Sequence, residues 1–139
     1  MGFAIRRPAT AFSLDKSSKA TKSFKDDKHL AFIRLLPSCI SGERPCDAAH
    51  ISAGNPLYNK KRTGGAQKAS DCWVVPLTRS EHEAQTNHGE ELDWWRAQGI
   101  DPFELAIKLY EVSGDLPAGI EIIRNARTQR TNSDRKAKA

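Results

Sequence analysis

The run DCWVVPL at residues 71–77, followed directly by TRSE, limits most tightly how this chain can fold. Its aromatic and β-branched residues predict a short strand, and Pro76 marks the end of that strand or an edge position because it has no backbone N–H to donate. Thr78 and Glu81 then fit the Thr-x-x-Glu capping box, which predicts that a helix begins at once. We therefore expect a strand that passes into a helix almost without a connecting loop.

The segment before this strand combines one helix with a long irregular stretch. DDKHLAFIRLLP opens with two aspartates, carries Leu30, Ile33 and Leu36 on one helical stripe, and stops at its final proline. Residues 38–70 are rich in Gly, Asn, Pro and Lys, with one short extended candidate at 46–51. Long structureless stretches inside compact domains are usually functional or flexible.

Helical patterns follow the strand. The helix that begins at TRSE is expected to break near 87–89, and EELDWWRAQ is a further helical piece that ends at Gly99, with one of its two adjacent tryptophans in the core. In DPFELAIKLYEVSG, Asp101 is a cap and Pro102 occupies the first helical position. Another short helix is expected from Pro117 to about residue 126. The predicted class is α+β: a helix, an irregular β-hairpin, a helix, and then two or three C-terminal helices.

Length and charge divide the chain into one domain with two tails. At 139 residues, it can form one domain with a modest core. The net charge of +5 belongs to the ends, because residues 1–28 sum to +4, residues 124–139 to +5 and the middle to −4. We expect basic disordered tails at 1–25 and 128–139 around a domain at 26–127. Such tails give solubility, or they contact a polyanion.

Composition also indicates in which cellular compartment the protein is expected. No apolar run approaches the roughly 20 residues of a membrane helix, and no signal peptide is visible, so we expect a cytoplasmic protein with no membrane partner. The three cysteines are an odd number, and free thiols are the default for such a chain. Cys46 and Cys72 could meet across the hairpin, but two cysteines alone do not make a zinc site.

Three residues along the chain stand in a recognisable order: His50 in DAAHIS, Asp71 in KASDCW and His82 in TRSEHEAQ. A histidine leaving a strand, an acidic residue in a loop and a histidine on the next helix describe the ββα-metal arrangement. The blocks HLAFIRLLPSCISGERPCDAAHI, GGAQKASDCWVVPLTRSEHEAQ and WWRAQGIDPFELAIKLY resemble the HNH nuclease superfamily. They look most like its compact phage and prophage proteins, which include a recombinase-dependent endonuclease, and the resemblance covers residues 29 to about 114.

The resemblance implies a metal-dependent DNA endonuclease with a ββα-metal core. On it, His50 is the general base that takes a proton from water, Asp71 holds the loop and the base in place, and His82 is a metal ligand. Imidazole has a pKa near about 6.5 in model peptides and suits the base role at neutral pH. Phosphodiester hydrolysis also requires a divalent cation, here Mg²⁺ or Mn²⁺, which keeps water and phosphate oxygens in its remaining positions.

The chain departs from the family pattern at four positions. The family often binds a structural zinc through a Cys-x-x-Cys pair before the first strand and a Cys-x-x-His pair at the helix start. Those positions here are Ser38, Ser41, Thr78 and Glu81, so no structural zinc is expected. Cys39 is one residue out of register.

A second departure concerns catalysis. The superfamily commonly has Asp or His directly before the base and a second ligand one turn beyond the helix histidine, where this chain has Ala49 and Thr86. His88 could substitute as a metal ligand if the helix breaks at 87–89, and Asp47 is another possible ligand. These departures favour a second hypothesis, a nucleic-acid-binding protein that kept the fold and lost catalysis.

The expected partner is DNA, and a recombinase filament is a further partner implied by the resemblance, in a bacterial or phage-infected cell. A basic loop lies between the proposed base and Asp71, where a DNA backbone would pass. Its candidate phosphate contacts are Lys60, Lys61, Arg62 and Lys68. A third hypothesis, a small helical interaction protein, is disfavoured by the order of His50, Asp71 and His82.

Overall fold

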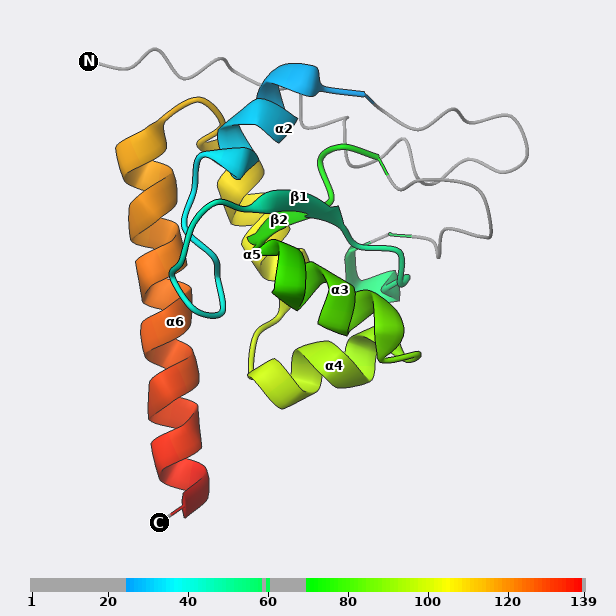
Figure 1. The fold of residues 1–139 in the computed structure, drawn as a ribbon, viewed down its shortest axis with the longest axis vertical. Helices are drawn as coiled ribbons and strands as arrows, with labels where there is room; N and C mark the ends of the chain where they lie inside the picture. The colour runs from blue at the N-terminus through cyan, green and yellow to red at the C-terminus, as the bar shows by residue number, and fades with distance from the viewer. Residues whose placement is uncertain (1–24, 59, 61–69, 139) are drawn as a thin grey trace.

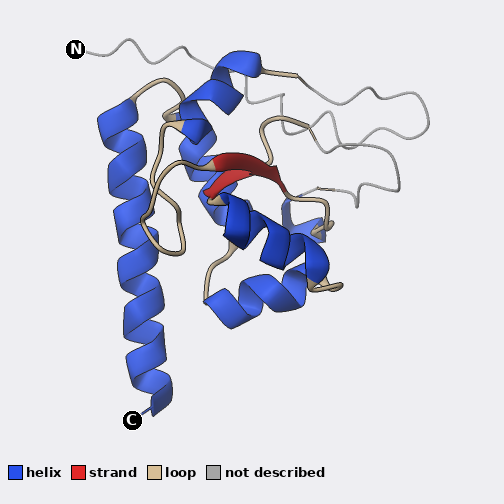
Figure 2. Cartoon of the chain, viewed as in Figure 1, coloured by secondary structure: helices blue, strands red, loops and turns tan. Residues whose placement is uncertain are grey.

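The computed structural model describes residues 25–58, 60 and 70–138, with side chains up to residue 129. It is an α+β fold in which helices surround one short two-stranded sheet (Figures 1 and 2). The predicted tail at 1–25 lies almost entirely outside the described residues. In chain order the elements are α2 (Asp27–Arg34), β1 (Asp47–His50), the 3-10 turn η2 (Pro56–Tyr58), β2 (Val74–Leu77), α3 (Arg79–Asn87), α4 (Glu91–Gln98), α5 (Pro102–Glu111) and α6 (Leu116–Lys138).

The sheet is antiparallel and short. β1 pairs with β2 so that Asp47 lies opposite Leu77 and His50 opposite Val74. Pro76 lies within β2 opposite Ala48, a position that a proline tolerates because each strand of a two-stranded sheet has an open edge. The strand is shorter than the 71–77 run, because the chain turns through residues 71–73 before pairing begins. Helices α2, α3 and α5 pack against the sheet, and all four residues of β2 are buried.

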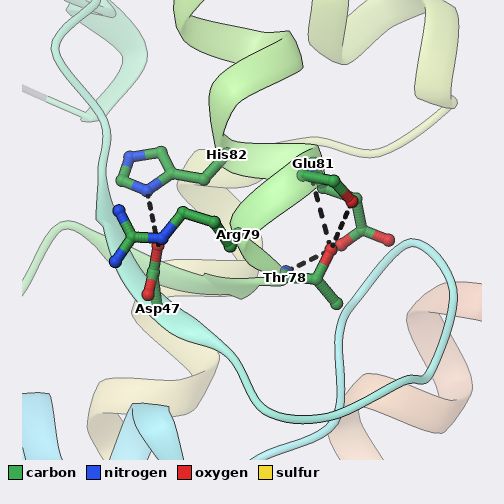
Figure 3. Close-up of polar contacts among 6 residues, drawn as sticks. Asp47, Thr78, Arg79, Glu81 and His82 are labelled. Atoms are coloured by element: carbon green, nitrogen blue, oxygen red, sulfur yellow. Dashed lines mark hydrogen bonds and ion pairs between the residues drawn. The ribbon is translucent and has the colours of Figure 1, made fainter.

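Helix termini follow their local sequence signals. The predicted capping box at the start of α3 is present: Thr78 accepts a hydrogen bond from the backbone of Glu81, whose side chain accepts one from the backbone of Thr78 (Figure 3). Asp101 caps α5 through two backbone N–H groups, with Pro102 behind it. Gly99 ends α4 at a φ of 72°, in the left-handed region that glycine enters at little cost.

The core gathers around β2 and α5. Both Trp94 and Trp95 are buried, at 7% and 2% exposure, so the expectation that only one of them would lie in the core was wrong. Their ring centroids lie 4.9 Å apart in an edge-to-face arrangement, so the two adjacent side chains pack against each other within the core. His29 is also fully buried, and its Nδ1 lies 2.8 Å from the Ser113 hydroxyl. None of the helices in the described ranges has the length and apolar character needed to span a bilayer.

Helix α6 is longer than the sequence led us to expect. The sequence led us to expect a short helix ending near residue 126, whereas α6 continues without a break to Lys138 and so runs through most of the segment expected as a tail at 128–139. No proline or glycine follows Gly119, so no helix-breaking residue interrupts the run. Figure 1 shows α6 along one side of the molecule, where it extends past the other elements.

Gly119 sets how closely α6 approaches α2. A Cβ atom at this position would lie 2.7 Å from the Phe32 ring and 2.8 Å from a Leu36 methyl group, and both of those side chains are buried. The absence of a side chain at position 119 therefore permits this contact.

We predict that Gly119→Val lowers the free energy of unfolding by about 2 kcal/mol, the usual range for overpacking a buried contact. Asn125→Val, at an exposed position of the same helix, is the matched control for the cost of a β-branched residue. Chemical denaturation of both variants measures the difference. Equal stabilities for the two variants would contradict a close α2–α6 contact.

Candidate active site

His50 ends β1 with its ring bound to a carboxylate. The Nε2 atom lies 2.8 Å from Oδ1 of Asp71, and the two side chains are 23% and 12% exposed. Strand pairing brings the two side chains together. Just beyond β1, the backbone N–H of Ile51 donates a hydrogen bond to the carbonyl of Trp73, so the turn before β2 that carries Asp71 lies next to His50. A carboxylate favours a proton on the ring nitrogen that faces it, which leaves Nδ1 of His50 as the acceptor.

The same carboxylate also ties the strand region to α2. Oδ2 of Asp71 accepts a 2.8 Å hydrogen bond from the backbone N–H of Asp26, the N-cap residue of α2. The Asp26 side chain in turn accepts from the backbone of His29 at 3.1 Å and from the Tyr110 hydroxyl at 3.3 Å. Both oxygens of Asp71 are thus engaged, and its orientation depends on contacts with β1 and α2.

His82 forms a second histidine–carboxylate pair on α3. Its Nδ1 lies 3.1 Å from Oδ2 of Asp47, and Nε of Arg79 lies 3.3 Å from the same oxygen. Figure 3 shows the opposite edge of the imidazole pointing away from Asp47. Asp47, considered a possible metal ligand, therefore contacts His82 instead of lining the pocket that His82 enters.

The two histidines line one open pocket of about 850 Å³. Its walls come from α2, the end of β1 with the loop after it, the exposed face of α3 and the start of α4. The lining residues are Leu30, Arg34, Ala48, His50, Ser52, Ala53, Gly54, His82, Gln85, Thr86, Gly89, Glu90, Glu91 and Leu92. Of the predicted site residues, His50 and His82 thus share a space, with Asp71 directly behind His50.

Of the two proposed metal ligands, His82 lines the pocket and His88 does not. Thr86 lies one turn beyond His82 in the same pocket, whereas His88 is the exposed C-cap of α3 and does not line it. In the described part of the chain, no three His, Cys, Asp or Glu side chains converge as a ready-made metal cage. His82 nevertheless has the arrangement typical of a metal-binding histidine, with one ring nitrogen held by a carboxylate and the other directed elsewhere. It fits an ion that takes most of its ligands from substrate and water.

Lys60, a predicted phosphate contact, lies in a buried position. Its side chain is 4% exposed, with Nζ 5.9 Å from the centre of the Trp73 ring, because the turn that holds it folds back through paired backbone bonds with Asn55. The other three predicted contacts, Lys61, Arg62 and Lys68, lie outside the described residues.

Glu91 holds the loop that follows His50. Its carboxylate accepts hydrogen bonds from the backbone N–H groups of Ser52 and Ala53 at 2.9–3.3 Å. Burial raises the pKa of Glu91 above its ordinary value, although these N–H groups and the nearby Lys60 oppose the shift. Sequence reasoning missed Glu91 and the pocket residue Arg34. The only sequence signal for Arg34 was its spacing of one helical turn from Leu30.

The four positions at which the resemblance would place zinc ligands meet through hydrogen bonds. The Ser38 hydroxyl donates to Oε1 of Glu81 at 2.5 Å, and the backbone of Thr78 donates to the same oxygen at 2.9 Å. Burial alone would raise the pKa of Glu81, but hydrogen bonds from Ser38, Ser41 and Thr78 outweigh it and lower the pKa below its ordinary value. We call these four residues the Glu81 cluster. It joins the loop before β1 to the start of α3.

The three cysteines are free and buried. Cys39 and Cys72 are fully buried, and Cys46 is 6% exposed. Burial is the main cause that raises the pKa of the Cys46 thiol to about 11, with a further contribution from the nearby Glu81. The expectation of free thiols is therefore confirmed.

No protein-family model, no curated protein sequence and no solved structure matches this chain.

We predict that Glu81→Gln lowers the free energy of unfolding by about 1–2 kcal/mol at pH 7, because a neutral amide accepts these hydrogen bonds less strongly. The pKa of Glu81 is lower in the folded state, so its contribution is present above the ordinary value of 4.5 and is lost as pH falls through the folded pKa. The gap between the two proteins should narrow below pH 4.5. Denaturant titrations across pH test this, with Glu83→Gln on the exposed face of α3 as control. A gap independent of pH would contradict it.

We also predict that all three thiols resist a disulfide reagent in the native protein at about pH 8 and react in concentrated guanidinium chloride. Spectrophotometric thiol counting measures both states. One thiol reacting rapidly without denaturant would show that a cysteine is accessible in solution.

Proposed function

We propose that this chain is a metal-dependent DNA endonuclease of the HNH type. The observation that carries the proposal is that two histidines, each bound to a carboxylate through one ring nitrogen, line the same pocket on a β1–β2–α3 unit. This order of two antiparallel strands and a helix is the one the resemblance implies for a ββα-metal core. An open pocket on the surface can admit an extended polymer such as a DNA strand.

In the proposed reaction His50 is the general base. Its Nδ1 takes a proton from the attacking water, while the Asp71 carboxylate at Nε2 stabilises the imidazolium that results. Asp71 also holds the ring in place, because its second oxygen is bound to the backbone at the start of α2. Positioning and charge compensation thus come from the same side chain.

His82 would hold the Mg²⁺ or Mn²⁺ ion through Nε2, with Asp47 fixing the ring from behind. Such an ion supplies Lewis-acid stabilisation of charge on the phosphate and the leaving oxygen. The chain offers few ligands for it, which suits an ion that is bound largely by the phosphate of the substrate. Duplex DNA is the proposed partner, and a recombinase filament remains a proposal based on the resemblance.

One observation favours a second candidate, a DNA-binding protein without catalysis. Thr86 lies in the pocket where a second helix ligand would be expected, and a hydroxyl is a poor substitute for imidazole. In that case His50 and His82 would contribute to DNA binding alone.

We predict that the wild-type protein nicks supercoiled plasmid with Mg²⁺ or Mn²⁺, and that His50→Ala lowers the rate by about 10²–10⁴-fold through loss of the base. His82→Ala should raise the metal concentration needed for half-maximal nicking. His88→Ala should behave as wild type, because His88 is exposed and outside the pocket. Retained DNA binding with no nicking by the wild type under either metal would reject the endonuclease and support the second candidate.

A further inference from the structure

Arg34 brings a cation to the pocket that His50 and His82 share. It lies in the last turn of α2, and Leu30, one turn earlier, lines the same pocket. Helix α2 packs against both strands of the sheet, so the backbone that carries Arg34 is held in a constant position relative to β1. The side chain itself is exposed.

The charges around Arg34 leave its guanidinium available to a ligand. Within the ranges that the structure describes, the Arg34 side chain makes no hydrogen bond or ion pair, in contrast to that of Arg79, which is bound to Asp47. Arg34 is also the only lysine or arginine among the described residues that line the pocket. Two carboxylates, those of Glu90 and Glu91, also line the pocket, and that of Glu91 accepts hydrogen bonds from backbone N–H groups of the loop after β1.

A phosphodiester suits such a group. A guanidinium stays protonated at all ordinary pH values, and its planar fork of donors can bind two phosphate oxygens at once. Charge-assisted hydrogen bonds of this kind are about twice as strong as neutral ones. A general base on one wall and an arginine on another define where a phosphate between them would lie.

We propose that Arg34 binds the non-bridging oxygens of the scissile phosphate and positions that phosphate between His50 and His82. The proposal rests on the proposed endonuclease function. Arg34 would thereby hold the phosphorus atom within reach of the water that His50 activates and would offset negative charge as the bond breaks.

The test compares Arg34→Ala, Arg34→Lys and the matched control Lys28→Ala, which removes a positive charge from an exposed position of the same helix outside the pocket. Plasmid nicking gives kcat and KM, and fluorescence anisotropy with a short labelled duplex in chelator gives metal-free binding across salt concentrations. Circular dichroism melting checks that all variants remain folded, as expected for exposed side chains.

We expect Arg34→Ala to lower kcat/KM by roughly 10- to 100-fold, from the loss of charge-assisted bonds to phosphate. Arg34→Lys should recover only part of this, since an ammonium group keeps the charge but not the fork. Lys28→Ala should match wild type. The salt dependence of binding by Arg34→Ala should be shallower by about 0.9 in log–log slope, because one phosphate contact is lost.

The outcomes separate this inference from the function on which it rests. If the wild type nicks DNA and Arg34→Ala nicks as well as Lys28→Ala does, Arg34 has no role at the phosphate and the endonuclease stands. If the wild type binds DNA without nicking, the endonuclease fails and so does a scissile phosphate at Arg34. A wild type that neither nicks nor binds DNA overturns both.

Discussion

The carboxylate of Asp71 is the contact on which the arrangement of the pocket depends. It lies in the turn before β2, where the side chain is 12% exposed. Burying a carboxylate costs free energy unless its oxygens accept hydrogen bonds. One oxygen meets the ring of His50 and the other the backbone of Asp26. Three segments far apart in the sequence are thereby joined at one side chain. Displacing any of them would leave an oxygen of Asp71 without its partner.

Glu81 performs a comparable task at the start of α3. Its carboxylate accepts a hydrogen bond from the Ser38 hydroxyl in the loop before β1 and another from the backbone N–H of Thr78. The second of these bonds belongs to the capping box of α3. These hydrogen bonds thus fix the loop before β1 against the first turn of α3, directly after β2 ends. His82 is the next residue on that helix, so the Glu81 cluster also sets where its ring enters the pocket.

The sequence was most informative where a signal and its consequence lie within a few residues. The capping box at Thr78 and the proline after Asp101 act on the adjacent backbone, so their reading depends on local chemistry alone. Features that depend on distant partners were missed. The burial of Lys60 requires the Trp73 ring, and the role of Asp47 requires a histidine 35 residues later to face it. No periodicity in the chain encodes either pairing.

The two histidine–carboxylate pairs differ in charge, and on the proposed function this difference assigns their roles. Among the residues that the structure describes, Asp71 contacts the ring of His50 and one neutral backbone N–H, and no lysine or arginine forms an ion pair with it. Asp47 shares one oxygen between His82 and the Arg79 guanidinium, which already offsets its charge. His50 thus faces a carboxylate that it shares with no cation, whereas His82 shares its carboxylate with Arg79. On the proposed function, the first arrangement suits an imidazole that takes a proton from water beside a carboxylate, and the second suits an imidazole that is held in place to bind a metal ion.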